Sequence, residues 1–171
     1  MKEKTSRGVH YLLAIFEIAA GVIFDQWTKV LAVRHLKDQD PFVIWDNVFE
    51  LHYLENRGAA FGMLQNQLFI FYISVFLVTG FLIYFFLRIP MTKKFLPLRV
   101  SAIFIAAGAY GNFIDRVRLN YVVDFFYFKL IDFPIFNVAD IYVTVTTFVL
   151  VFLIIFYYKE EDLDGIFTRR K

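Results

Sequence analysis

The sequence predicts an all-α membrane protein with four transmembrane helices and a small extracytoplasmic β-hairpin, or cradle, between the first two. The composition, four long apolar runs and the distribution of basic residues all point to this class. Of the 171 residues, 59% are apolar and 20% are aromatic, and the mean hydropathy is +0.57. Soluble domains contain only about 45–50% apolar residues. We therefore expect residues 1–171 to form one domain whose solvent is lipid.

The composition also excludes several classes of protein and site. Because the chain contains no cysteine, disulfides, thiolate metal sites and cysteine nucleophiles are excluded. The net charge is only +2 and the basic residues are scattered, whereas nucleic-acid binding requires a basic face. The three histidines, His10, His35 and His52, all precede the polar residues between positions 108 and 140 that are described below, so we expect no metal and no other cofactor.

Four apolar runs are long enough to cross a bilayer. They cover residues 9–33, 68–87, 100–119 and 139–158. The second run contains no charged residue, and at about 1.5 Å per residue its length matches the roughly 30 Å hydrocarbon core. The first run exceeds the apolar core of a cleaved signal peptide, so we expect it to be retained. A polar tail, residues 159–171, follows the fourth run.

Residues 34–67 separate the first two runs and have strand-like patterning. The stretch 42–45 and the stretch 48–54 are rich in β-branched and aromatic residues and flank Asp46-Asn47, a turn-forming pair. We expect a hairpin here. The following segment 55–62 contains small residues, which let the backbone approach another group closely, although a simple loop that re-enters the membrane has the same composition.

Basic residues indicate the orientation. Most of the 18 lysines and arginines lie in the two tails and in the loop between the second and third runs. The positive-inside rule therefore places both termini in the cytoplasm. Five polar residues then converge at the outer ends of their segments: Asp25, Asn56, Asp115, Asp124 and Asp140.

The helix-forming runs present polar residues at regular spacing. Asn112 lies three residues before Asp115 and four before Arg116, so we expect the three to share one helix face. Asn137 and Asp140 repeat the three-residue spacing. Each asparagine can orient a carboxylate, and we expect Arg116 to hold Asp115 ionised.

Asp124 and Asp140 then remain as a facing pair without an obvious cation. Two carboxyl groups that lie close together in a low-dielectric site share a proton. The ionised member can take a proton from water while the protonated member donates to the oxyanion of a peptide bond. A structural alternative is that Asp140 merely caps the fourth helix.

Asp25 and Lys29 lie four residues apart in the first apolar run, and two interpretations remain open. They can form a salt bridge near the interface with Lys29 reaching outward. Alternatively, Asp25 faces the bundle and orients a catalytic group.

Five motifs in this order resemble bacterial lipoprotein signal peptidase, the type II signal peptidase. They are DQWTK at 25–29, ENRGAAFG at 55–62, GNFIDR at 111–116, VVDF at 122–125 and FNVAD at 136–140. The resemblance implies an intramembrane aspartic endopeptidase that removes the signal peptide from diacylglyceryl-modified prolipoproteins and cleaves before the lipidated cysteine. It also implies a multi-pass protein of the bacterial cytoplasmic membrane, in contact with membrane lipid, and we expect a monomer.

The resemblance assigns roles residue by residue. Asp124 and Asp140 match the catalytic pair. Positions that support the site or the substrate are matched by Asp25, Lys29, Asn56, Gly58, Asn112, Asp115, Arg116, Asn137 and Ala139. Small pockets for the substrate would be lined by Gly58, Ala59, Ala60 and Ala139. The departures from the family pattern are Ala107 in place of a glycine, Ile141-Tyr142 in place of a serine-containing continuation, and a short segment between Asp124 and Asp140.

Two other classes of protein also use such features. A proton-coupled membrane transporter would place its acids near the midplane, with broken helices and an internal repeat, and the sequence shows neither. A non-enzymatic membrane assembly factor would use the hairpin as a docking surface and would tolerate amide substitution at both aspartates.

Overall fold

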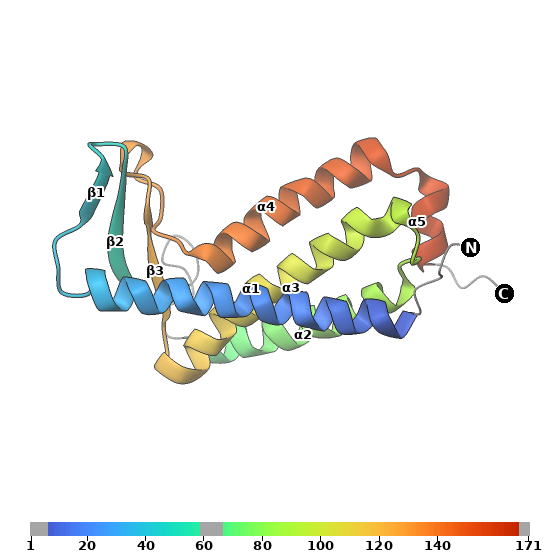
Figure 1. Ribbon diagram of the computed structural model, residues 1–171, viewed down its shortest axis with the longest axis horizontal. Coiled ribbons are helices and arrows are strands. Elements are labelled where there is room, and N and C mark those ends of the chain that lie inside the picture. Colours follow the sequence, from blue (N-terminus) through green and yellow to red (C-terminus); the bar gives the residue numbers. More distant parts are fainter. Residues whose placement is uncertain (1–6, 59–66, 168–171) are drawn as a thin grey trace.

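Four long helices run through the computed structural model, which describes residues 7–58 and 67–167 (Figure 1). They are α1 (Arg7–Leu36), α2 (Leu68–Arg88), α3 (Leu96–Leu119) and α4 (Val138–Phe152). A short 3₁₀ turn, η2 (Lys93–Phe95), leads into α3, and a π-helical turn, η4 (Leu153–Tyr157), continues α4. With these extensions, all four are long and apolar enough to cross a membrane. The predicted fold class is confirmed.

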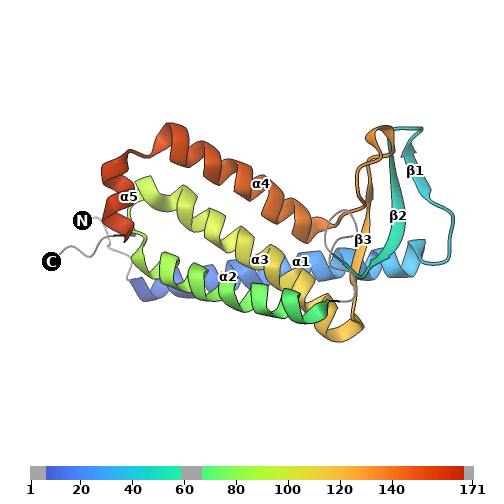
Figure 2. The same cartoon turned by 180° about the vertical axis from the view of Figure 1, so that it is seen from behind.

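The sheet lies at the end of the bundle where α1 ends and α4 begins (Figures 1 and 2). Its strands β1 (Phe42–Trp45) and β2 (Phe49–Asn56) form the predicted hairpin. A third strand, β3 (Val122–Tyr127), pairs antiparallel with β2 and places Asp124 opposite Leu54. This third strand was not predicted from the sequence; it follows α3 after Asn120, whose backbone is left-handed.

Helix α3 is the centre of the bundle, packing against α1, α2 and α4. Its small residues allow this close approach. A Cβ atom added at Gly108 would lie 2.5 Å from the carbonyl oxygen of Ala139 on α4. At Gly111 an added Cβ would lie 2.5 Å from Oδ2 of Asp25 on α1. The two glycines therefore set how near α1 and α4 come to α3.

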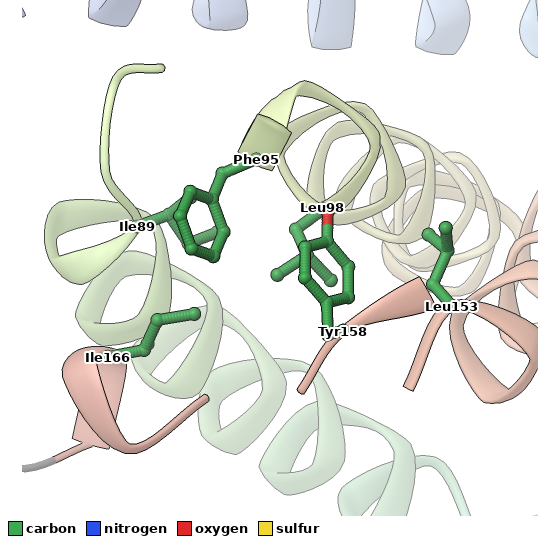
Figure 3. Packing of buried hydrophobic residues seen from close by; sticks show 6 residues of the cluster. All are labelled: Ile89, Phe95, Leu98, Leu153, Tyr158 and Ile166. Atoms are coloured by element: carbon green, nitrogen blue, oxygen red, sulfur yellow. The ribbon is translucent and has the colours of Figure 1, made fainter. Parts of the chain in front are cut away.

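The end of the chain folds back on the bundle. The expected polar tail contains a further helix, α5 (Glu160–Phe167), because Leu163 and Ile166 lie three residues apart on one face. Ile166 is only 1% exposed. It belongs to an apolar cluster, shown in Figure 3, whose other buried members are Ile89, Phe95, Leu98, Leu153 and Tyr158.

Candidate active site

A cavity of about 810 Å³ opens where the sheet meets α2, α3 and α4. Asp124 from β3 and Asp140 from α4 both line it. Other candidate site residues on its wall are Asn56, Gly58, Asn112 and Arg116. The structure thus brings together side chains from four segments that are distant in the sequence.

Asp124 is only 1% exposed, and two side-chain amides donate hydrogen bonds to its carboxyl group. Asn56 Nδ2 donates to Oδ2 at 2.8 Å, and Asn137 Nδ2 donates to Oδ1 at 2.6 Å. Burial, followed by the charge of Asp140, raises the pKa of Asp124 to about 7. Asp124 therefore exchanges its proton near neutral pH.

Asp140 occupies the first turn of α4 and takes part in a capping box. Its backbone N–H donates to Asn137 Oδ1 at 3.0 Å, and its Oδ2 accepts from the backbone N–H of Asn137 at 3.1 Å. Asn112 Nδ2 donates to the other oxygen, Oδ1, at 2.8 Å. The capping role foreseen as an alternative is real, but it fixes a carboxyl group that also faces the cavity.

Asn137 contacts both aspartates. Its side-chain nitrogen reaches Asp124 and its backbone nitrogen reaches Asp140. The same side-chain nitrogen lies 3.1 Å from Asn112 Oδ1, so the amides form one connected network. With Asn137 fully buried, this network holds the two carboxyl groups in fixed relative positions.

Behind the two aspartates lies a buried group of charges. Lys29 Nζ is 2.9 Å from Asp25 Oδ2 and 3.0 Å from Asp115 Oδ2. It also donates to Asn112 Oδ1 at 2.9 Å, which turns the Asn112 amide nitrogen toward Asp140. The Asp25–Lys29 salt bridge is present, but Lys29 points inward and is only 3% exposed. Asp25 also faces the bundle, so each of the two interpretations describes part of the arrangement.

The expected pairing of Arg116 with Asp115 is wrong. Successive helical residues point about 100° apart, so Asp115 turns toward Lys29 while Arg116 turns toward the cavity. Arg116 Nη2 donates to the carbonyl oxygen of Gly58 at 3.1 Å, and its guanidinium lies 3.9 Å from the ring centroid of Phe71. The expectation that Asp124 and Asp140 lack a nearby cation is also wrong, because Arg116 lines the same cavity.

The small residues have different places. The Gly58 N–H donates to Asn56 Oδ1 at 2.9 Å, which orients the amide that holds Asp124. Ala139 is fully buried and is not among the residues that line the cavity, so it forms no substrate pocket there. Ala59 and Ala60 lie outside the described residues. Within residues 7–58 and 67–167, no cluster of three or more His, Asp or Glu side chains has metal-binding geometry.

Two residues that contribute to this site were not predicted from the sequence. Gln26 contacts Asp115 and the carbonyl oxygen of Gly111, and Phe71 packs on Arg116. Gln26 carried a usable signal, since it is an amide within an apolar run and adjacent to Asp25. Phe71 carried none, because it is one of many aromatic residues in α2.

Comparison with known proteins identifies the family. The family model described as Signal peptidase (SPase) II matches residues 17–156. The chain belongs to the signal peptidase II family. The lipoprotein signal peptidase of Clostridioides difficile (strain 630) is 42% identical over 146 residues, which cover 85% of this chain and 97% of that protein. That of Caldanaerobacter subterraneus subsp. tengcongensis is 44% identical over 146 residues, covering 84% and 97% respectively.

The fold of this signal peptidase II agrees with solved structures. A bacterial membrane enzyme determined by the in meso method at 2.3 Å resolution superimposes with a TM-score of 0.74 at 31% identity, covering 93% of each chain. Another, at 1.9 Å resolution, gives a TM-score of 0.73 at 32% identity, covering 92% of this chain and 99% of that one. The protein is thus a multi-pass membrane peptidase of the signal peptidase type.

Proposed function

We propose that this signal peptidase II is an intramembrane aspartic endopeptidase with Asp124 and Asp140 as its catalytic pair. Its substrates would be diacylglyceryl-modified prolipoproteins, cleaved before the lipidated cysteine. The observation that carries the proposal is that Asn137 bonds to both carboxyl groups at the wall of one cavity. The relatives named lipoprotein signal peptidase support the class of substrate.

The environments of the two aspartates suggest different roles. Burial raises the pKa of Asp124 to about 7, which favours its protonated form below that pH. Asp140 lies at the N-terminus of α4, where the helix dipole favours a negative charge. We therefore assign Asp140 as the base and Asp124 as the acid.

The reaction then follows from these two protonation states. Asp140 takes a proton from water, whose oxygen attacks the carbonyl carbon of the scissile peptide bond. Asp124 donates its O–H to the developing oxyanion. The proton taken by Asp140 passes to the leaving nitrogen as the carbon–nitrogen bond breaks. The products are a signal peptide with a free carboxylate and a lipidated cysteine with a free amine.

The cavity wall fits a lipid-anchored substrate. Beside the carboxyl groups, it carries apolar side chains from the membrane-spanning helices, namely Val75, Ile141, Val143 and Val145. Acyl chains that remain in the bilayer can contact these side chains while the peptide reaches the polar wall. Anchoring of the lipid would thus hold the scissile bond beside Asp124 and Asp140.

The catalytic assignment is tested with purified Asp124→Asn and Asp140→Asn, incubated with a diacylated precursor peptide and with its unlipidated twin. We expect neither variant to cleave, with each melting near the wild-type temperature, and we expect the wild type to cleave only the lipidated peptide. Asp46→Asn is the matched control, because Asp46 is an exposed aspartate in the β1–β2 turn. Near-normal turnover by either catalytic-pair variant would overturn the assignment.

We further propose that the chain acts as a monomer in the inner membrane, with both termini in the cytoplasm and the cavity at the extracytoplasmic face. The concentration of basic residues in the tails and the second loop supports this orientation. Because the chain has no cysteine, single cysteines at Asp46 and Asp164, both exposed, can be labelled selectively. We expect a membrane-impermeant maleimide to label Asp46→Cys in intact cells and Asp164→Cys only after permeabilisation. The reverse pattern would refute the orientation.

A further inference from the structure

The buried charges make a backbone contact beside each candidate catalytic aspartate. Asp25 Oδ1 accepts from the backbone N–H of Ala139 at 2.9 Å, and Ala139 directly precedes Asp140. Asp115 Oδ2 accepts from the backbone N–H of Val123 at 3.2 Å, and Val123 directly precedes Asp124. The separation of Asp25 and Asp115 is therefore coupled to the separation of the two aspartates in the cavity.

Gln26 connects Asp25 and Asp115 to each other. Its Nε2 lies 2.8 Å from Asp115 Oδ1 and 3.3 Å from Asp25 Oδ2. The same nitrogen lies 3.1 Å from the carbonyl oxygen of Gly111 on α3. A primary amide has two N–H groups, so these three acceptors share them. Gln26 itself is not among the residues that line the cavity.

Electrostatics explains why an uncharged donor is useful here. In the buried group, Lys29 supplies one positive charge to two carboxylates, Asp25 and Asp115. Each buried carboxylate needs donors for both of its oxygens. The Gln26 amide supplies donors without changing the net charge, whereas a carboxylate in its place would add a third negative charge.

We propose that Gln26 is a positioning residue, whose amide holds Asp25 to Asp115 and thereby fixes the spacing of Asp124 and Asp140. This inference rests on the catalytic pair proposed above. Since Gln26 acts behind the cavity wall, its loss should impair the chemical step more than substrate binding. A misplacement of about 1 Å in a catalytic group can cost about 100-fold in rate.

The first test is Gln26→Met, which keeps the length of the side chain but removes both N–H donors. We expect kcat on a diacylated precursor peptide to fall about 10- to 100-fold and KM to stay within about twofold of wild type. Thr28→Val is the matched control on the same turn of α1, since the Thr28 hydroxyl donates to the backbone oxygen of Asp25 in its own helix. This control should retain the wild-type kcat.

The second test is Gln26→Glu, measured as the ratio of its kcat to that of wild type across pH. A protonated glutamic acid can still donate one hydrogen bond to Asp115, whereas the ionised form cannot and repels both neighbours. We therefore expect the ratio to rise as the pH is lowered. A merely structural defect would lower the amount of folded protein without this pH dependence.

The outcomes separate this inference from the proposed function. If Asp124→Asn and Asp140→Asn are inactive while Gln26→Met keeps a kcat within about twofold of wild type, the role of Gln26 is refuted and the catalytic pair stands. If Gln26→Met yields no folded protein, the pH-dependent ratio for Gln26→Glu decides, and a flat ratio refutes the role. Activity in either catalytic-pair variant overturns the proposed function itself.

Discussion

Asp25 accepts a hydrogen bond of 2.9 Å from the backbone N–H of Ala139, although 114 positions separate the two residues in the sequence. Because Ala139 is joined directly to Asp140, any displacement of Asp25 is transmitted to the start of α4. A carboxylate in the first transmembrane helix thus helps to place a carboxyl group in the fourth. The contact is possible because Gly111 leaves space for the Asp25 side chain.

Gly111→Ala should therefore disrupt the site from a distance. The new methyl group would lie 2.5 Å from Asp25 Oδ2 and 3.2 Å from the Ala139 Cβ, so α1 and α4 must both shift. Overpacking of this kind costs about 1–3 kcal/mol. We expect a lower melting temperature and a kcat reduced about 10-fold or more, measured by thermal denaturation in detergent and by peptide cleavage.

The control for this substitution is Gly80→Ala in α2. Among the residues that the structure describes, a Cβ at Gly80 meets no atom within 4 Å, so the change should be neutral or stabilising by about 0.5–1 kcal/mol through helix propensity. If Gly111→Ala behaves like Gly80→Ala, the coupling between Asp25 and α4 is refuted.

Lys29→Met should destabilise the whole protein. Without its ammonium group, Asp25 and Asp115 would be two buried carboxylates with no cation between them. Removal of one partner from a buried ion pair costs about 3–5 kcal/mol. We expect a much lower melting temperature, whereas Lys37→Met, which removes a surface salt bridge with Glu55 and a cation–π contact with Tyr53, should lower it far less. Equal melting temperatures for the two variants would contradict the structural role of Lys29.

Activity should decline as the pH rises above neutrality. Asp124 must be protonated to donate to the oxyanion, and burial together with the charge of Asp140 raises its pKa to about 7. The alkaline limb of kcat/KM should therefore lie near pH 7. Asn56 favours the ionised form of Asp124 by donating to it, so Asn56→Ala should raise this pKa and move the limb to higher pH. A shift to lower pH would contradict the assignment of Asp124 as the acid.

The same raised pKa affects stability with a definite sign. The pKa of Asp124 rises from an ordinary value of 3.8 to about 7 in the folded protein. Between these values the folded state binds more protons than the unfolded state, so this group's contribution to stability falls as the pH rises through that window. Asp124→Asn should remove that part of the pH dependence of the melting temperature.

The helices and the hairpin could be predicted because their patterns are local. Long apolar runs indicate spans, and alternation around Asp46-Asn47 indicates the turn. β3 was missed for a physical reason: its first four residues, Val122 to Phe125, are all buried. A strand buried on both faces lacks alternation and is difficult to distinguish from a short helical segment.

The sequence could predict which residues form the candidate site, but not which of them contact one another. The motifs indicated Asp124 and Asp140 as the catalytic pair, and in the structure both residues line the same cavity. The rotation of the helices about their axes decides which cation faces which carboxylate. The adjacent positions of Asp115 and Arg116 therefore led to the wrong pairing, since Asp115 contacts Lys29 and Arg116 contacts Gly58. The contacts of Gln26 cross from α1 to α3, so no pattern within either helix could specify them.

Ile166→Ala should affect stability without affecting catalysis. Ile166 is 1% exposed in the cluster shown in Figure 3, and it lies beyond residues 17–156, which the family model matches. Truncation of a buried isoleucine to alanine costs about 2–5 kcal/mol, so the melting temperature should fall clearly. Because α5 and the sheet lie at opposite ends of the helices (Figure 1), kcat/KM well below the melting temperature should match wild type. Gly165→Ala is the matched control, since a Cβ there meets no atom of residues 7–58 and 67–167 within 4 Å. A large loss of kcat/KM in folded Ile166→Ala would instead mean that packing of α5 is coupled to the cavity through α3 or α4.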